Sequence, residues 1–115
     1  MWELNVWYHT LNCGYQARIS GETDFPCIYG DKVGLGRIYV KLPENEELTF
    51  DNWIAGLKDG RSYCGDGLSH VIDFKVNDVG VGEPGPDGAI SQLNIDQPGK
   101  VKVEFDVSAL LAATY

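Results

Sequence analysis

The sequence predicts a mainly β fold, an antiparallel β-sandwich with one central helix and an N-terminal helix–strand appendage. Three observations lead to this class. Short segments in which apolar and polar residues alternate recur after residue 60, and turns rich in glycine and proline separate them. Two helical patterns stand apart from these segments, one at the N-terminus and one at residues 49–59. Short strands with one polar face are typical of antiparallel sheets and sandwiches.

The first predicted element is a helix within the first fourteen residues. Its apolar residues follow the i, i+3, i+4, i+7 spacing that places side chains on one helix face. They are Leu4, Trp7, Tyr8 and Leu11. Gly14 follows the last apolar position by three residues, and a left-handed C-terminal cap favours a residue without a Cβ atom.

Two short strands are predicted next, at residues 15–20 and 37–42, because apolar and polar residues alternate in both. Between them, residues 21–36 hold Pro26 and several glycines, a composition typical of a loop. The kind of predicted element then changes near Pro43, where the two strands and their loop give way to a helix and a run of further strands.

The helix predicted at 49–59 has clear start and stop signals. Thr49 is a favourable N-cap and Gly60 stands where a C-terminal cap is expected. The apolar positions within it are Phe50, Trp53, Ile54 and Leu57. They share one face, so we expect Trp53 to belong to the hydrophobic core.

Five strands are predicted after this helix, since the apolar period changes to two. They lie at residues 61–64, 69–77, 79–81, 90–96 and 101–107. In the second of them, His70 is in phase with Ile72, Phe74 and Val76, which predicts that all four share one face.

Charge and length narrow the possible functions. The chain has 115 residues and a net charge of −8, from 9 Lys and Arg against 17 Asp and Glu. Such acidity repels phosphate groups, so we expect no nucleic-acid partner and no anionic membrane partner. A chain of this length can form one hydrophobic core without a metal or a disulfide.

Three segments resemble a known family. WELNVWYHTLNCGYQARISGETDFP, VGLGRIYVKL and WIAGLKDGRSYCGDG are similar to the C-terminal portion of CehA/McbA-like hydrolases, a branch of the PHP (polymerase and histidinol phosphatase) metal-dependent hydrolases. The family has a distorted barrel with a metal centre of His and Asp residues, and a β-rich region often follows that barrel. The resemblance implies that residues 1–42 are the end of a barrel-like region and that residues 43–115 form a helix plus β-sandwich.

The same resemblance implies a metal-ligand role for Asp24, in the GETD segment, within a full-length parent that holds zinc or manganese. The HxH ligands of the family are absent here, because His9 and His70 are the only histidines and stand alone. From the residues themselves, Asp24 is a turn-former. One carboxylate does not hold a divalent ion tightly, so this chain is expected to carry no cofactor and no catalytic residue.

Two other groups of residues have alternative interpretations. Cys64, Asp66 and His70 lie close in sequence, but their spacing matches no standard metal motif, which favours a partly buried, hydrogen-bonded His70. Cys13, Cys27 and Cys64 lack a CxxC pattern and are interpreted as packing residues, with a Cys27–Cys64 disulfide as the alternative.

These inferences lead to two hypotheses of function. The first is a non-catalytic C-terminal fragment of a PHP-like metal-dependent hydrolase, inactive on its own, in which the β-sandwich is structural or accessory. The second is a stand-alone β-sandwich module for binding or assembly, with a carbohydrate or protein partner held by aromatic residues such as Trp2 and Trp7. Both expect the apolar face of the N-terminal helix to contact either a second copy or the missing barrel.

Overall fold

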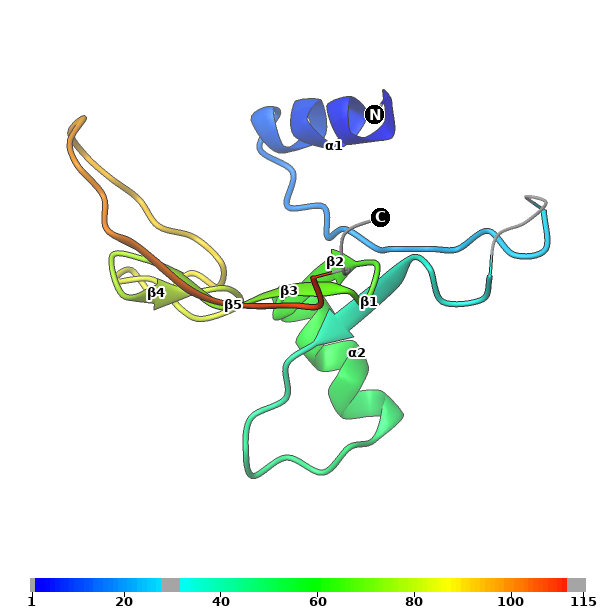
Figure 1. Ribbon diagram of the computed structural model, residues 1–115. Coiled ribbons are helices and arrows are strands. Elements are labelled where there is room, and N and C mark those ends of the chain that lie inside the picture. Colours follow the sequence, from blue (N-terminus) through cyan, green and yellow to red (C-terminus); the bar gives the residue numbers. More distant parts are fainter. Residues whose placement is uncertain (1, 28–31, 112–115) are drawn as a thin grey trace.

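The computed structural model describes residues 2–27 and 32–111 and confirms a mainly β fold, with two antiparallel sheets and two helices (Figure 1). The elements are α1 (Trp2–Asn12), β1 (Arg37–Val40), α2 (Phe50–Asp59), β2 (Ser62–Gly65), β3 (Ser69–Val76), β4 (Val79–Gly80) and β5 (Val103–Ala109). One sheet pairs β1 with β2, and the other has the strand order β4-β3-β5. Residues 28–31 of the predicted loop lie outside the described residues.

Both predicted helices are confirmed, and α2 has the predicted caps. The Thr49 hydroxyl accepts a hydrogen bond from the Asn52 N–H at 3.2 Å. At the other end, Gly60 has a φ of 83°, the left-handed conformation that a C-terminal cap requires. Short-range signals therefore determine this helix, because each cap depends on residues within a few positions of it.

The sheet of β1 and β2 joins the two segments that the sequence separates near Pro43. Arg37 is opposite Gly65 and Val40 is opposite Ser62 in its antiparallel register. Helix α2 packs on this sheet at Gly56, where an added Cβ atom would lie 2.6 Å from Val40 Cγ1. The absence of a side chain at Gly56 is what permits this close approach.

A β-bulge in β3 changes which residues share a face. Ile72 is opposite Asp106, but Lys75 is opposite Glu104, so Asp73 and Phe74 together face Phe105. Asp73 has a φ of 52°, outside the β region. The prediction that His70 and Ile72 share a face with Phe74 and Val76 is therefore wrong, because an extra residue reverses the alternation at this point.

The bulge gathers apolar residues on one face of the three-stranded sheet. We call this set the apolar sheet face: Val71, Phe74, Val76, Val103, Phe105 and Val107. The Phe74 and Phe105 rings stack there, with their centroids 6.1 Å apart. On the opposite face lie the polar residues Lys75, Glu104 and Asp106.

Two predicted strands do not form. Residues 15–20 belong to no strand, because alternation alone supplies no neighbouring strand to pair with. Residues 90–96 contribute only the bridge between Pro84 and Ile90. The next residue, Ser91, has a φ of 57°, which turns the backbone out of the β conformation.

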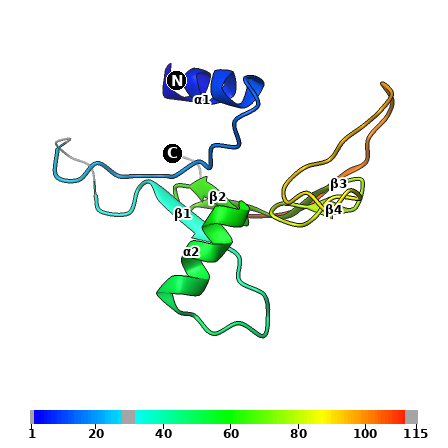
Figure 2. The ribbon, with the colours of Figure 1, turned by 180° about the vertical axis from the view of Figure 1, so that it is seen from behind.

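Helix α1 lies apart from the two sheets, on the side opposite to α2, in two opposed views (Figures 1 and 2). The Trp7 indole N–H donates to the Ala17 carbonyl at 2.8 Å and ties the helix to the segment that follows it. Many of its apolar side chains remain exposed, among them Trp2 at 80% and Tyr8 at 52%. The described residues provide little that covers this helix.

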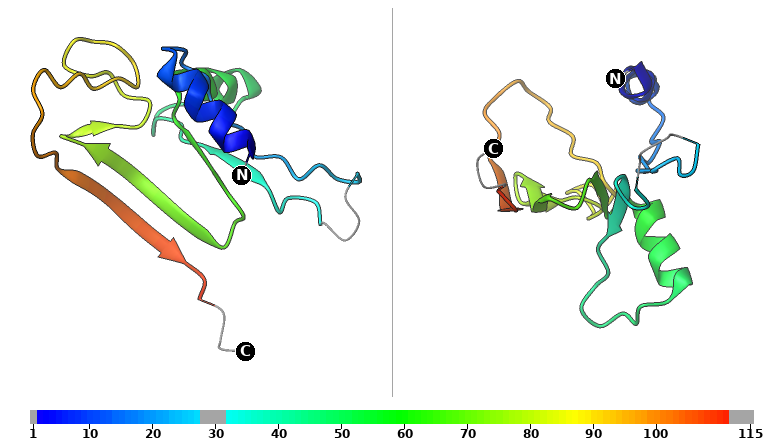
Figure 3. Two further views of the ribbon diagram at one scale, coloured as in Figure 1. Left: turned by 90° about the horizontal axis from the view of Figure 1, so that it is seen from above. Right: turned by 45° about the vertical axis from the view of Figure 1, so that its right-hand side comes forward.

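Among the described residues, no hydrophobic side chain is buried, and the buried positions are Gly56, Gly60, Gly80 and Gly82. The expectation that Trp53 is a core residue is wrong, since Trp53 is only half-buried. The accessible surface is 9352 Å², against about 6,200 Å² for a compact monomer of this mass. The radius of gyration, 16.4 Å, also exceeds the roughly 13 Å of a compact chain. Figure 3 shows the open arrangement from two further directions.

Candidate functional site

An open groove of about 950 Å³, which we call the inter-sheet groove, lies on the described part of the chain. It lies between the β1–β2 sheet and the β3–β4 hairpin. Its lining comes from residues 39–43, 59, 61–63, 71–75, 80–84 and 90. Aromatic and apolar side chains alternate there with charged ones, a lining typical of a binding surface.

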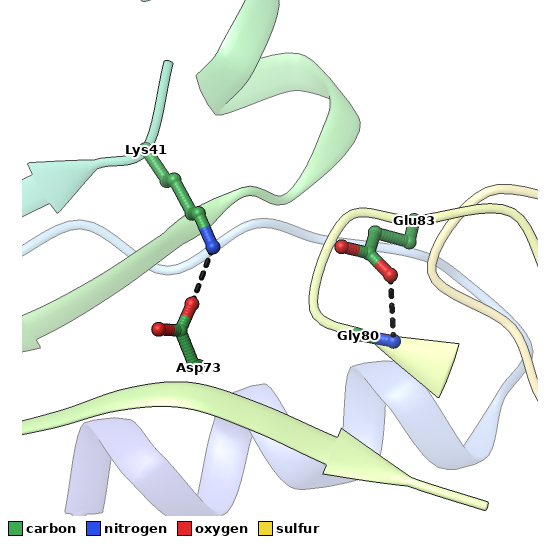
Figure 4. Close-up of polar contacts among 4 residues, drawn as sticks. All are labelled: Lys41, Asp73, Gly80 and Glu83. Carbon is green, nitrogen blue, oxygen red and sulfur yellow. Dashed lines mark hydrogen bonds and ion pairs between the residues drawn. The ribbon is translucent and has the colours of Figure 1, made fainter. Parts of the chain in front are cut away.

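An ion pair between Lys41 and Asp73 spans this groove (Figure 4). Lys41 follows β1, and Asp73 projects from the bulge in β3, so two sheets supply the two partners. The hydrogen bond to Asp73 raises the pKa of Lys41, and the same hydrogen bond lowers the pKa of Asp73. Both side chains are about half or more exposed, so solvent screens the attraction.

The turn after β4 closes the other side of the groove. The Glu83 carboxylate accepts the Gly80 N–H at 3.2 Å, as Figure 4 shows. Gly82 lies against Arg61, whose guanidinium approaches Asp59 at 3.4 Å. The Arg61 Nε atom is buried and has no hydrogen-bond partner among the described residues. Lys41 and Arg61 both have carboxylate partners within the chain, Asp73 and Asp59. We therefore interpret these charged side chains as groups that stabilise the walls of the groove.

An aromatic cluster lies beside the groove. The rings of Tyr39 and Tyr63 stack with centroids 5.0 Å apart, and His70 packs edge-on against Tyr39 at 4.9 Å. The Tyr63 hydroxyl and His70 Nδ1 form a hydrogen bond of 2.7 Å. Burial raises the pKa of Tyr63. The prediction of a partly buried, hydrogen-bonded His70 is confirmed.

Three residues that lie close in sequence make separate contacts in the structure: Cys64, Asp66 and His70. Asp66 caps its own turn by accepting the Leu68 N–H at 2.8 Å, while His70 bonds to Tyr63. Cys64 is a free thiol whose pKa is raised by burial, and Cys13 and Cys27 are also free. No three His, Cys, Asp or Glu residues gather as a metal site within residues 2–27 and 32–111.

Asp24 lies in a β-turn whose Cys27 N–H donates to the Asp24 carbonyl at 2.8 Å. Its backbone φ is 57°, the peptide bond between Phe25 and Pro26 is cis, and the side chain is exposed. The turn that the residues predict is therefore present. The metal-ligand role that the family resemblance implies for Asp24 remains a proposal.

The sequence did not single out Thr23, which joins the GETD segment to the glycine-rich loop before β1. Its hydroxyl donates to the Gly36 carbonyl at 3.1 Å and accepts the N–H groups of Gly34 at 3.0 Å and Gly36 at 3.3 Å. These partners lie 11 to 13 residues away. No local pattern signals such contacts, because they depend on how the loop folds back.

We expect Thr23→Val to lower the free energy of unfolding by about 1–3 kcal/mol, because partly buried backbone groups lose their partner at nearly constant side-chain volume. Thr10→Val is the control. The Thr10 hydroxyl donates to Val6 O within α1, where helical bonds remain, so this change should stay within about 0.5 kcal/mol. Denaturant unfolding measures both, and equal effects would show that the Thr23 contacts are not stabilising.

The carboxyl of Asp66 should make stability depend on acid pH. The hydrogen bond from the Leu68 N–H lowers the pKa of Asp66 in the folded chain. A lowered folded pKa gives stability that is fully present above the ordinary value of about 3.9 and is lost as pH falls through the folded pKa. Asp66→Asn keeps an acceptor oxygen but cannot titrate. When the pH falls below about 4, the denaturant midpoint of this variant should therefore decrease less than that of the unmodified chain. An unchanged pH profile in this variant would contradict the assignment.

Comparison with models of protein families, with curated proteins and with solved structures finds no match for this chain. Within the described segments, no helix has the length and apolar character to cross a membrane.

Proposed function

We propose that this chain is a structural, non-catalytic portion of a larger protein, specifically the C-terminal accessory part of a PHP-like metal-dependent hydrolase. The family assignment depends on the three sequence segments that resemble those hydrolases. The proposal of a structural role is supported by the exposure of the apolar side chains. No hydrophobic side chain among the described residues is buried. A chain of average apolar content reaches a stable fold only when that surface is covered.

The amount of uncovered surface supports the proposal that a large partner covers this chain. The accessible area exceeds that of a compact monomer by about 3,000 Å², whereas a standard protein interface buries about 800 Å² on each side. A continuous protein core is the natural source of so much contact area. In this proposal the preceding barrel supplies it.

Two surfaces face the partner in this proposal: the apolar side of α1 and the apolar sheet face. They line one open cavity of about 380 Å³, to which Trp7 and Leu11 contribute from the helix and Phe74 and Val76 from the sheet. Another layer placed over the sheet face would complete the β-sandwich. The sandwich thus belongs to the assembled protein rather than to this chain alone.

Asp24 is assigned to the metal centre of the assembled protein, where zinc or manganese would be held together with histidines from the barrel. Its exposed position in a turn leaves the carboxylate accessible to such a neighbour. Barrel enzymes present catalytic groups on loops that follow strands, and in the assembled protein residues 15–20 would be such a strand.

The genomic reading frame upstream of this segment tests the proposal, and an in-frame barrel with an HxH motif is the expected result. In the joined protein, Asp24→Asn should lower the bound zinc or manganese measured by mass spectrometry, together with phosphoester hydrolysis. Asp66→Asn is the matched control and should leave both unchanged. An unrelated upstream sequence, or full metal content in the Asp24→Asn protein, would refute the proposal.

A stand-alone binding or assembly module is the second candidate, and the inter-sheet groove favours it. The tyrosine rings of Tyr39 and Tyr63 lie at this groove and can contact a carbohydrate or protein partner. An upstream gene without a barrel would support this candidate.

A further inference from the structure

The strand β5 presents a long unpaired edge. The three-stranded sheet has the order β4-β3-β5, and every residue of β5 is exposed. On the other side of the sheet, β4 has only two residues and is followed closely by Pro84, which has no N–H to donate. The long free edge of this sheet is therefore that of β5, and Figure 3 (left) shows it at the outside of the sheet.

Hydrogen bonds at both ends of β5 determine which backbone groups point toward this free edge. The Leu110 N–H donates to Leu68 O, and the Asn77 N–H donates to Lys102 O. The Lys102 N–H in turn donates to Asn77 Oδ1 at 2.9 Å. Even-numbered residues therefore direct their backbone groups to β3, because the direction alternates along an antiparallel strand. The odd-numbered residues direct theirs outward, so their N–H and C=O groups are available for pairing.

The segment just before β5 can lengthen this edge. Residues 99–102 belong to no strand, but none of them has a positive φ, so no left-handed residue prevents them from continuing β5. The chain bends before this segment, at Asp96 and Gln97. The edge thus offers residues 99–107, and every one of them is exposed.

The charges along this segment lie in a self-complementary order. Its even-numbered residues are two cations followed by two carboxylates: Lys100, Lys102, Glu104 and Asp106. Lys102 and Glu104 already form an ion pair at 2.8 Å, and Lys75 of β3 lies opposite Glu104. Lys100 and Asp106 form no ion pair with any residue that the structure describes. The two outermost charges of the segment therefore lack a partner within the described chain.

Antiparallel pairing with a second copy brings opposite charges together in one register. A two-fold axis at Val103 places Lys102 opposite Glu104 of the second copy. The same axis places Lys100 opposite Asp106 of the second copy, and symmetry repeats both pairs. Opposite charges that face each other across two strands stabilise the pairing. This register therefore gives the two outermost charges the partners that they lack in one chain.

Neighbouring registers place like charges together. An axis at Phe105 sets Glu104 opposite Asp106, and an axis at Glu104 or at Lys102 sets that residue opposite its own copy. Like charges directly opposite each other destabilise strand pairs. The net charge of −8 on each chain repels in every register, but salt screens charges that lie more than about 8–10 Å apart. Charge thus selects the register centred on Val103.

We propose that the free edge of β5 pairs with the same edge of a second copy of this chain, antiparallel and centred on Val103. The two three-stranded sheets then form one sheet of six strands. Backbone hydrogen bonds join Val103 to Val103 of the second copy and Val101 to Phe105 of the second copy. The apolar sheet face continues across the axis, because the odd-numbered residues of both copies lie on the same side.

This contact is separate from the surfaces that the preceding section assigns to the barrel. It uses the backbone edge of β5, whereas the barrel would cover the apolar side of α1 and the apolar sheet face. The proposal therefore does not depend on the family assignment. Because few residues take part, the pairing belongs to the weak class of interfaces and is populated at high protein concentration.

Amide hydrogen exchange of the full chain tests the proposal, measured residue by residue by NMR over a roughly twentyfold range of protein concentration. We expect exchange to slow with rising concentration at Val101, Val103 and Phe105, because mass action drives the pairing. The amides of Glu104 and Ser108 already face β3, so they should be protected at every concentration and report that the sheet is folded. Exchange at Val103 that does not change with concentration would overturn the proposal.

Two single substitutions test the register. Lys100→Glu sets carboxylates opposite each other across the axis, and Asp106→Lys sets lysines opposite each other. Each variant alone should lower the pairing constant by about fivefold or more. An equimolar mixture of the two variants restores opposite charges at these positions, so protection of Val103 should return in the mixture.

Lys32→Glu and Glu46→Lys are the charge-matched controls, because they make the same changes of net charge at exposed positions outside β5. Alone and mixed, they should pair nearly as the unmodified chain does. Equal losses in the controls would show that net charge, not the strand edge, governs the association and would overturn the proposal. So would a mixture of Lys100→Glu and Asp106→Lys that protects Val103 no better than either variant alone. Stronger pairing of Asp106→Lys would place the axis at Phe105 and would also overturn the proposal.

Discussion

Gly82→Ala is expected to abolish the ordered inter-sheet groove and to cause a large loss of stability. Gly82 is buried with a φ of 75°, and an added Cβ atom would lie 2.6 Å from the Arg61 backbone nitrogen and 2.8 Å from its Cα atom. The left-handed backbone costs a residue with a Cβ atom about 1–2 kcal/mol, and the overlap with backbone adds about 1–3 kcal/mol. Denaturant unfolding, followed by tryptophan fluorescence, measures the sum.

Gly88→Ala is the matched control for this experiment. Gly88 has nearly the same conformation, with a φ of 81°, but an added Cβ atom would have no neighbour within 4 Å. The free energy of unfolding of this variant should decrease only by the cost of the left-handed backbone, about 1–2 kcal/mol. The difference between the two variants isolates the close approach of Gly82 to Arg61, and equal losses would show that this approach contributes nothing.

The isolated chain is expected to associate through the apolar face of α1, and light scattering should show a dimer or a larger species. The double substitution Leu4→Glu with Leu11→Glu should lower the association constant by at least about a hundredfold. Each leucine side chain contributes on the order of 1 kcal/mol when its exposed part is covered, and burying the new charges is unfavourable. The two side chains are 42% and 37% exposed, so each still has apolar area to bury.

Asn5→Glu with Asn12→Glu makes the same change of charge on exposed positions of α1 outside this face. We expect this control to associate nearly as the unmodified chain does. If both double variants dissociate equally, net charge rather than the helix face controls association. A monomeric unmodified chain with an ordered, covered α1 would contradict the prediction itself.

Local signals in the sequence accounted for the helices and for most of the strands. The caps at Thr49 and Gly60 and the alternation in β1, β2 and β5 depend on neighbouring residues, so they can be recognised without the fold. The strands predicted at 15–20 and 90–96 were wrong because a strand also requires a partner and a β backbone, and Ser91 leaves the β region. The partly buried His70 was also predicted, but its partner Tyr63 was not, since that contact depends on how the chain turns between β2 and β3.

The sequence by itself determined the mainly β class, the two helices and the acidic surface, because periodicity, capping and charge act over a few residues or over composition as a whole. Only the tertiary structure decided which residues share a face of β3, that Thr23 joins two loops, and that the apolar residues remain uncovered. The physical reason is that these features depend on the bulge at Asp73 and on contacts between residues distant in sequence. Alternation fixes the direction of a side chain relative to its neighbours, but only the paired sheet shows what lies opposite it.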